Sequence, residues 1–354
     1  MPKLPPLGKI DSEFFNEIIF PRLGAKRPEI AVGPKHGVDV GIIEIGEYAL
    51  ALSADPVFIV PEYGFERAAW FAFHILFSDA VTSGLAPAYL AIDLNLPPAI
   101  SESELETIWK VIDREAKKYG VAIVTGHTAR YGGCDYPMVG GAVAIAKGGK
   151  DDYCSPKFIE PGDKIIVTKG PAIEATGIFA AMFPKYLAGT IGAELAKQAE
   201  ALFYKMSVLD DAIAAASVGT RNNGVSAMHD ATECGLWGGI CELVAAAGLG
   251  AEIHMEKIPV LPAVKAVCSM FDIDPFKSIS EGTLILTARP YKAEAVLNAI
   301  STKGIQAAII GEVTKEKSVY VLDGGSRAQI EHPRIDPFWA AFYGAIEKYA
   351  EIEV

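Results

Sequence analysis

Short apolar segments with strand and helix periodicity alternate along the whole chain, and this alternation restricts the fold more than any other feature of the sequence. Between Gly37 and Lys147, runs with strand character alternate with two segments that are apolar at helical spacing, residues 67–84 and 101–120. From residue 164 the alternation resumes and continues to a strand at 318–322. Such a pattern predicts an α/β or α+β protein in which helices cover the sheets.

Two local signals within the first half are specific. The apolar runs 38–45 and 48–53 flank Gly46-Glu47, which predicts a β-hairpin. Ser101 and Glu104 have the spacing of a capping box at the start of the second helix, and Gly120 is the expected stop.

A turn-rich segment, residues 148–162, divides the chain into two domains. It is rich in Gly, Pro and charged residues, which is typical of a linker. A chain of 354 residues with 51% hydrophobic residues is also long enough for two cores. We therefore expect an N-terminal segment, two domains and a helical tail, with the boundaries 1–35, 36–150, 160–325 and 326–354.

Composition argues against several classes of protein. The 32 basic and 44 acidic residues give a net charge of −12 without a basic cluster, so nucleic acid is not an expected partner. Five cysteines without a C-x-x-C pair argue against a disulfide framework and a zinc knuckle. No apolar run reaches the roughly 18 residues of a membrane span, and no secretory signal is visible, so we expect a cytoplasmic protein.

Four aspartates of the first domain lie where an element ends: Asp39, Asp55, Asp79 and Asp135. Asp55 follows a strand and precedes Pro56, which we expect to stop that strand, and Asp79 interrupts an apolar helix. An isolated aspartate at such a position is most often a cap or a turn residue. The set as a whole suits Mg²⁺, which prefers a few carboxylates together with the phosphates of a nucleotide.

Two further segments carry polar groups next to strand ends. We interpret residues 125–133 as a loop in which Gly126, His127, Thr128 and Arg130 surround phosphate, although His127 is equally well explained as a turn residue. The segment 228–236 joins a strand to a helix whose N–H groups could bind an anion. Asp230 or Thr232 could instead simply cap that helix. Loops 169–171 and 280–283 could close on the same site.

These motifs together resemble those of the superfamily of ATP-binding proteins related to aminoimidazole ribonucleotide (AIR) synthase, also called PurM-like. Its members include selenophosphate synthetase, thiamine-monophosphate kinase and the hydrogenase maturation factor HypE. The resemblance covers residues 7–336 and five motifs in the family's order. The motifs are Gly37-Val38-Asp39, Ser53-Ala54-Asp55, Ser78-Asp79-Ala80 with its Gly84-Leu85-Ala86-Pro87 end, Gly126-His127-Thr128, and His229-Asp230-Ala231-Thr232-Glu233-Cys234-Gly235-Leu236.

The resemblance implies a fold, a cofactor and a set of site residues. The fold is a two-domain α/β structure whose N-terminal sheet forms a β-barrel in a homodimer and whose C-terminal domain is an α/β sandwich, with ATP bound between them. Asp39, Asp55 and Asp79 would bind Mg²⁺. The implied nucleotide-binding residues also include Lys9, Gly37, Gly126, Thr128, Arg130, Thr232 and Glu233. The implied catalytic residues are Asp230, His229 and His127.

Three departures from the family's pattern limit what can be carried over. His127 stands where the family has a carboxylate, and Val38 replaces the first Asp of an Asp-Asp pair. HypE ends in Pro-Arg-Ile-Cys, whereas here Pro333-Arg334-Ile335 is followed by Asp336 and a further segment without cysteine. A reaction on the chain's own C-terminal thiol is therefore not expected.

The resulting hypothesis is a HypE-like enzyme that uses MgATP to phosphorylate or activate a small molecule or a protein-borne group. The alternative is a catalytically reduced nucleotide-binding scaffold in a maturation complex, with a maturation protein as partner. A third interpretation, a metallohydrolase using His127, His229 and the aspartates, has less support because the histidines lack a fixed ligand spacing.

Overall fold

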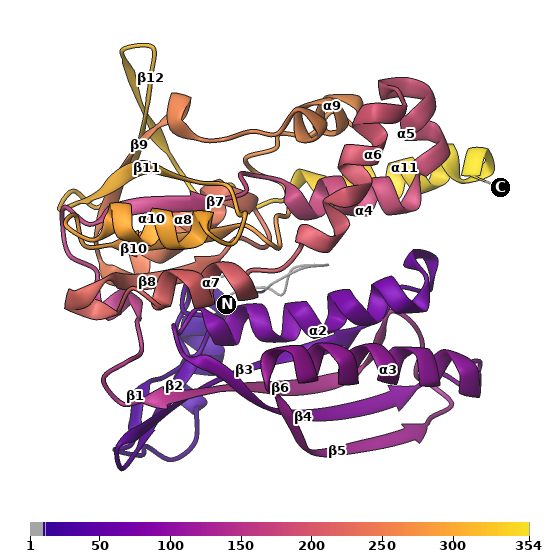
Figure 1. Ribbon diagram of the computed structural model, residues 1–354, viewed down its shortest axis with the longest axis horizontal. Helices are drawn as coiled ribbons and strands as arrows, with labels where there is room; N and C mark the ends of the chain where they lie inside the picture. The colour runs from indigo at the N-terminus through magenta and orange to yellow at the C-terminus, as the bar shows by residue number, and fades with distance from the viewer. Residues whose placement is uncertain (1–9, 11, 354) are drawn as a thin grey trace.

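The computed structural model describes residue 10 and residues 12–353, which form two sheets with helices between and around them (Figure 1). The first sheet has six strands in the order β1-β2-β3-β6-β4-β5, and only β4 and β5 are parallel. Its strands are β1 (Ile30–Val32), β2 (Gly41–Ile45), β3 (Tyr48–Phe58), β4 (Ala86–Leu96), β5 (Ala122–Arg130) and β6 (Met138–Gly149).

The predicted hairpin is confirmed, but its second strand is longer than expected. β2 pairs with β3 from Ile45↔Tyr48 to Gly41↔Leu52. β3 then continues past Pro56 to Phe58, so the expectation that Pro56 stops the strand was wrong. The pairing between β2 and β3 ends at Gly41↔Leu52, and beyond Leu52 β3 pairs only with β6. Proline is tolerated at such an edge because no neighbouring strand needs its missing N–H.

Two helices, α2 (Phe65–Val81) and α3 (Glu102–Tyr119), cover one face of this sheet (Figure 1). The capping box at the start of α3 is present: the Glu104 N–H donates to Ser101 Oγ at 3.3 Å, and the Ser101 N–H donates to Glu104 Oε2 at 2.7 Å. Gly120 ends the helix in the left-handed conformation, as its position in the sequence predicts.

The second sheet has seven strands in the order β13-β12-β9-β11-β7-β10-β8, and only β9 and β12 are parallel. Its strands are β7 (Lys164–Thr168), β8 (Val225–Asp230), β9 (Gly250–His254), β10 (Leu284–Ala288), β11 (Ala307–Thr314), β12 (Val319–Asp323) and β13 (Ser326–Ile330). The helices of this half are α4 (Ile173–Met182), α5 (Pro184–Ile191), α6 (Ala193–Ala201), α7 (Leu209–Ala216), α8 (Gly235–Ala247), α9 (Pro262–Met270), α10 (Ala293–Ser301) and α11 (Pro337–Glu353).

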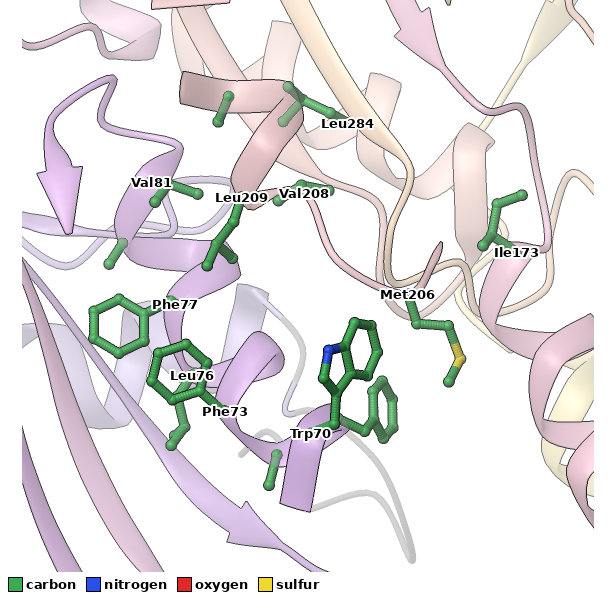
Figure 2. Packing of buried hydrophobic residues seen from close by; sticks show 14 of the residues in the cluster. Trp70, Phe73, Leu76, Phe77, Val81, Ile173, Met206, Val208, Leu209 and Leu284 are labelled. Atoms are coloured by element: carbon green, nitrogen blue, oxygen red, sulfur yellow. The ribbon is translucent and has the colours of Figure 1, made fainter. Parts of the chain in front are cut away.

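Helix α2 joins the two halves because both of its sides are apolar. Its Phe73 and Phe77 lie in the same buried cluster as Val208 and Leu209 at the start of α7 (Figure 2). The mixed α/β architecture with two sheets agrees with the predicted fold class. Among the described helices, none has both the length and the hydropathy of a transmembrane segment.

The tail helix α11 is packed rather than free. Phe338 at its start is fully buried, and its ring contacts Phe179 of α4 with centroids 5.1 Å apart. Tyr349 stacks on Tyr186 of α5 at 3.9 Å. The C-terminal segment is therefore packed against helices α4 and α5.

Candidate functional site between the two domains

The site lies where the carboxyl end of β8 meets the segment before β2. Ligand atoms of Asp39, His229 and Asp230 all lie within 4.8 Å of one another, and no other group of three or more His, Cys, Asp or Glu residues among the described residues is as close. His229 and Asp230 are the last residues of β8, and Asp39 comes from the first domain. This group therefore joins the two domains.

His229 acts in this structure as a bridge between carboxylates. Its Nδ1 lies 2.7 Å from Asp39 Oδ1 and its Nε2 lies 3.1 Å from Glu242 Oε2 on α8. Burial of the ring opposes the charged form, but the two carboxylates outweigh it and raise the pKa of His229 well above its usual value. A protonated imidazole donates from both nitrogens, so His229 fixes the orientation of the Asp39 carboxylate.

A group of carboxylates surrounds Asp230, and we call it the acidic cluster: Glu174, Asp230, Glu233, Glu281 and Asp336. Glu281 is 3% exposed, and its Oε1 accepts hydrogen bonds from Ser78 Oγ at 2.6 Å and from the Gly282 N–H at 3.1 Å. The Glu281 N–H in turn donates to Glu174 Oε2 at 2.9 Å. Glu174 is in the first turn of α4, and Glu281 is in the loop before β10.

Burial and mutual repulsion raise the pKa values of the two glutamates that contact one another, Glu174 and Glu281. Burial, followed by the charges of Asp230 and Glu174, raises the pKa of Glu281 well above its usual value. Part of Glu174 remains accessible to solvent, yet burial and the charges of Glu233, Asp336 and Asp230 still raise its pKa to about 8. Such a cluster favours protons or a bound cation.

The N-terminus of α8 binds a carboxylate of the chain itself, that of Asp336. The Cys234 N–H donates to Asp336 Oδ2 at 2.7 Å, and the Phe338 N–H donates to Asp336 Oδ1 at 2.8 Å. Burial and the charge of Glu233 raise the pKa of Asp336 to about 6. The N-cap of α8 is Cys234, so the alternative that Asp230 or Thr232 caps this helix was wrong. The Cys234 N–H, which we expected to bind a ligand anion, binds the Asp336 carboxylate instead.

The aspartates predicted to bind metal together do not form one group. Asp55 is on β3, opposite Ala142, and faces the same side of the sheet as Ser53, whose hydroxyl donates to the Leu76 carbonyl of α2 at 3.2 Å. Asp79 is in the last turn of α2, next to Ser78 and its bond to Glu281. Neither residue belongs to the group formed by Asp39, His229 and Asp230.

The predicted phosphate loop at 125–133 was wrong over most of its length, because β5 continues to Arg130. Parallel pairing with β4 places Gly126, Thr128 and Arg130 on the face of the buried Ile92, Leu94 and Leu96, which is the face covered by the helices. His127 pairs with Asp93 on the opposite face, so it cannot share one phosphate with Thr128. His127 Nε2 instead lies 2.9 Å from the Tyr131 hydroxyl, and Arg130 donates to the Ile100 carbonyl at 2.6 Å.

The remaining predicted residues have mixed positions. Gly37 has φ 74°, and a Cβ there would lie 2.6 Å from the Glu242 carbonyl oxygen, so glycine allows the segment before Asp39 to pack against α8. Thr232 and Glu233 lie in the turn between β8 and α8. Lys9 lies outside the described residues.

Sequence reasoning did not identify Glu174, Glu242, Glu281 or Asp336 as site residues. It did point to the loop 280–283 that contains Glu281. A usable signal for Glu174 was a single charge in the otherwise apolar helix 173–182, the same kind of interruption that drew attention to Asp79.

Family profiles match both halves of the chain. The AIR synthase related protein N-terminal domain matches residues 37–146, and the AIR synthase related protein C-terminal domain matches residues 160–324. Carbamoyl dehydratase HypE of Escherichia coli is 28% identical over 73% of this chain and 74% of its own length. A putative hydrogenase expression/formation protein of Methanocaldococcus jannaschii is 26% identical over 93% of this chain and 96% of its own length.

Solved structures have the same fold. A crystal structure of E. coli HypE superposes with a TM-score of 0.67 at 24% identity, covering 81% of this chain and 87% of its own. A structure of the hydrogenase maturation protein HypE in complex with ATP gives 0.63 at 20% identity, covering 94% and 97%. Together the profiles, relatives and folds identify the chain as an AIR synthase-related protein that is similar to the hydrogenase maturation protein HypE.

Proposed function

We propose that the site between the two domains binds ATP with Mg²⁺ and uses it to phosphorylate or activate a second substrate. The observation that carries this proposal is the acidic cluster around Asp230, in which two glutamates have raised pKa values. A divalent cation reduces the repulsion within this cluster and then attracts the phosphates of a nucleotide. The HypE structure with ATP and a thiamine-monophosphate kinase-like structure, AaThiL complexed with AMPPCP and TMP, support this choice of ligand.

In this proposal Asp39 and Asp230 hold the cation, and His229 keeps Asp39 in place. Asp55 and Asp79 stay predicted ligands, because the resemblance assigns them this role. The bound cation supplies charge neutralisation at the triphosphate, and the remaining contribution of the protein is positioning. Thr232 and Glu233, in the turn before α8, would border the acceptor.

The segment that follows Pro333-Arg334-Ile335 is an unsuitable acceptor. The residue after Pro333-Arg334-Ile335 is Asp336, whose two carboxylate oxygens are occupied by backbone N–H groups. Phe338 then anchors α11 in the core. We therefore place the acceptor group on a separate small molecule or on a partner protein, and the HypE-HypF complex among the similar structures supports a protein partner.

A homodimer through the first sheet is part of the same proposal. The face of that sheet away from α2 and α3 carries apolar residues that are only partly buried, such as Leu52, Val143 and Ile145. The edge strand β5 is largely exposed, with Val124 at 56%. Light scattering on the purified protein should therefore give twice the mass of 37.7 kDa, and a monomer would contradict this part.

Calorimetric titration with MgATP tests the nucleotide proposal. Asp39→Asn should weaken binding at least about tenfold, because it removes the charge of a proposed cation ligand. Asp323→Asn, at the exposed end of β12, is the matched control and should bind as the wild type does. Absence of MgATP binding by the wild type, or equal affinity of the two variants, would contradict the proposal.

The alternative, a nucleotide-binding scaffold without turnover, is favoured by the same fixed tail. Release of ADP distinguishes the two: ADP production stimulated by an acceptor indicates the enzyme, and tight ATP binding without ADP production indicates the scaffold.

A further inference from the structure

A cavity lies behind the acidic cluster, between β7, α6 and the segment before β11. Its volume is about 150 Å³, and its lining includes apolar side chains of Leu202, Leu261 and Ile305. The polar groups of the lining come from Lys169, Lys205 and Gln306. We call it the Lys169 cavity.

The charges around this cavity are not balanced. Lys169 is buried, and its ammonium donates to Asp211 Oδ1 at 2.5 Å and to the Ser207 carbonyl at 3.0 Å. An ammonium group has three donors, so one remains. Lys205 is exposed and forms no hydrogen bond or ion pair through its side chain with any described residue. The residues that line the cavity therefore include two cations and no carboxylate.

The two lysines are close enough to affect one another. Burial lowers the pKa of the Lys169 ammonium, the charges of Asp211 and Glu281 oppose this, and the positive charge of Lys205 lowers it further. A negative charge bound between the lysines would relieve this repulsion. The apolar walls suit a ligand that also has a short hydrocarbon part.

We propose that the Lys169 cavity binds a small organic anion, a short-chain carboxylate whose charged end lies between Lys169 and Lys205. At about 30 Å³ for each water molecule, its volume corresponds to about five waters, which is close to the size of butyrate. The Leu202, Leu261 and Ile305 side chains contact the hydrocarbon part.

The cavity is connected to the acidic cluster through two loops. The Lys205 carbonyl lies against Gly282, where an added Cβ would be 2.2 Å away, so Lys205 packs directly behind the loop that contains Glu281. Thr283 Oγ1 donates to the Gly170 carbonyl at 2.6 Å, which joins that loop to the one that leads into α4 and Glu174. Lys169 and Ala172 in the second loop have left-handed φ values of 60° and 53°, a strained conformation that is common next to functional sites.

Calorimetric titration with sodium butyrate, in the absence of nucleotide, tests this proposal. The wild type should bind one equivalent, and Lys205→Gln should weaken binding about tenfold, as expected for one lost charge-assisted hydrogen bond. Lys197→Gln, on the exposed side of helix α6, which precedes Lys205 in the chain, is the matched control and should bind as the wild type does. This variant pair leaves the buried Lys169 and Asp211 pair intact, so folding is not at risk.

Butylammonium chloride supplies the second arm, because it has the same hydrocarbon part and the opposite charge. The proposal expects no saturable binding of butylammonium. It is overturned if the wild type does not bind butyrate, if Lys205→Gln and Lys197→Gln bind it equally well, or if butylammonium binds as tightly as butyrate. None of these results depends on whether the protein binds ATP.

Discussion

The three strands β7, β10 and β8 carry buried charged residues at both of their ends. At one end opposite charges are paired, and at the other end carboxyl groups lie next to one another. At one end, Asp163 precedes β7 and Arg289 follows β10, and their side chains pair at 2.9 and 3.0 Å. Ser226 of β8 adds a hydrogen bond to Asp163 at 2.7 Å. At the other end, Asp230 and Glu281 lie next to further carboxylates.

The balanced end has the properties of a structural network. Arg289 also donates to the Phe158 carbonyl and to Asn222 Oδ1, each at 3.0 Å, so both terminal nitrogens of its guanidinium group are hydrogen-bonded. Of the described cations near the acidic end, His229 bridges Asp39 and Glu242, and Lys169 pairs with Asp211. Folding alone gains nothing from such repulsion, which is why we assign the acidic end to ligand binding.

Removing the cation of the balanced end should have the largest effect. Arg289→Ala leaves Asp163 buried without its partner, and we expect the free energy of unfolding to fall by about 3–5 kcal/mol in urea denaturation. Arg327→Ala is the control, because its ion pairs with Glu252 and Glu316 are exposed and should contribute about 0–1 kcal/mol. Equal losses in the two variants would contradict the comparison.

Removal of a charge from the acidic end should stabilise the protein instead of destabilising it. The folded-state pKa of Glu174 is about 8 and its usual value is 4.5, so the folded protein holds this proton where the unfolded chain has lost it. Stability of the wild type should therefore fall as pH rises from about 5 to 8. Glu174→Gln carries no such charge, and we expect it to become more stable than the wild type by on the order of 2 kcal/mol at pH 8 relative to pH 5.

Denaturation curves at pH 5 and pH 8 measure this difference. Glu347→Gln, on the exposed part of α11, is the control and should follow the wild type. A wild type that gains stability over Glu174→Gln with rising pH would show that the cluster is compensated by a group that the structure does not reveal.

A matched pair of serines gives the smallest expected effect. Ser226 and Ser78 are both fully buried, and each donates to a carboxyl group, Asp163 in one case and Glu281 in the other. Ser226→Ala should cost about 1.5–3 kcal/mol, because it removes a bond to a charged group. Ser78→Ala should cost about 0.5–1.5 kcal/mol, because burial raises the pKa of Glu281 and so disfavours the charged form of its acceptor. Thermal or urea denaturation at pH 7 measures both, and a larger cost for Ser78→Ala would reverse the assignment.

The same contrast explains how far the sequence could be interpreted. Local signals predicted local structure well: the Gly46-Glu47 hairpin and the Ser101 capping box depend only on neighbouring residues. The errors arose where a strand pairs with a strand that is distant in sequence. Pairing with β4 continues β5 through the segment that we predicted to be a loop. Pairing of β2 with β3 ends at Leu52, so Pro56 is tolerated inside β3.

The site was predictable only in part for the same reason. Asp39, His229 and Asp230 lie in recognisable motifs, and they do meet in space. Glu281 and Asp336 lie in segments that are ordinary in sequence, and their contacts with Ser78 and the Cys234 N–H exist only once the domains and the tail have packed. Asp55 and Asp79 stay predicted ligands of a nucleotide-bound cation.

The most direct test of the central claim, that the acidic cluster is unfavourable for folding and is retained for a cation, is the melting temperature at pH 8 with and without Mg²⁺. Without Mg²⁺, Asp230→Asn should melt at a higher temperature than the wild type, because it removes one of the repelling charges. Addition of Mg²⁺ should raise the melting temperature of the wild type and leave that of Asp230→Asn unchanged. A wild type that is the more stable of the two without Mg²⁺, and that does not respond to the ion, would contradict the account.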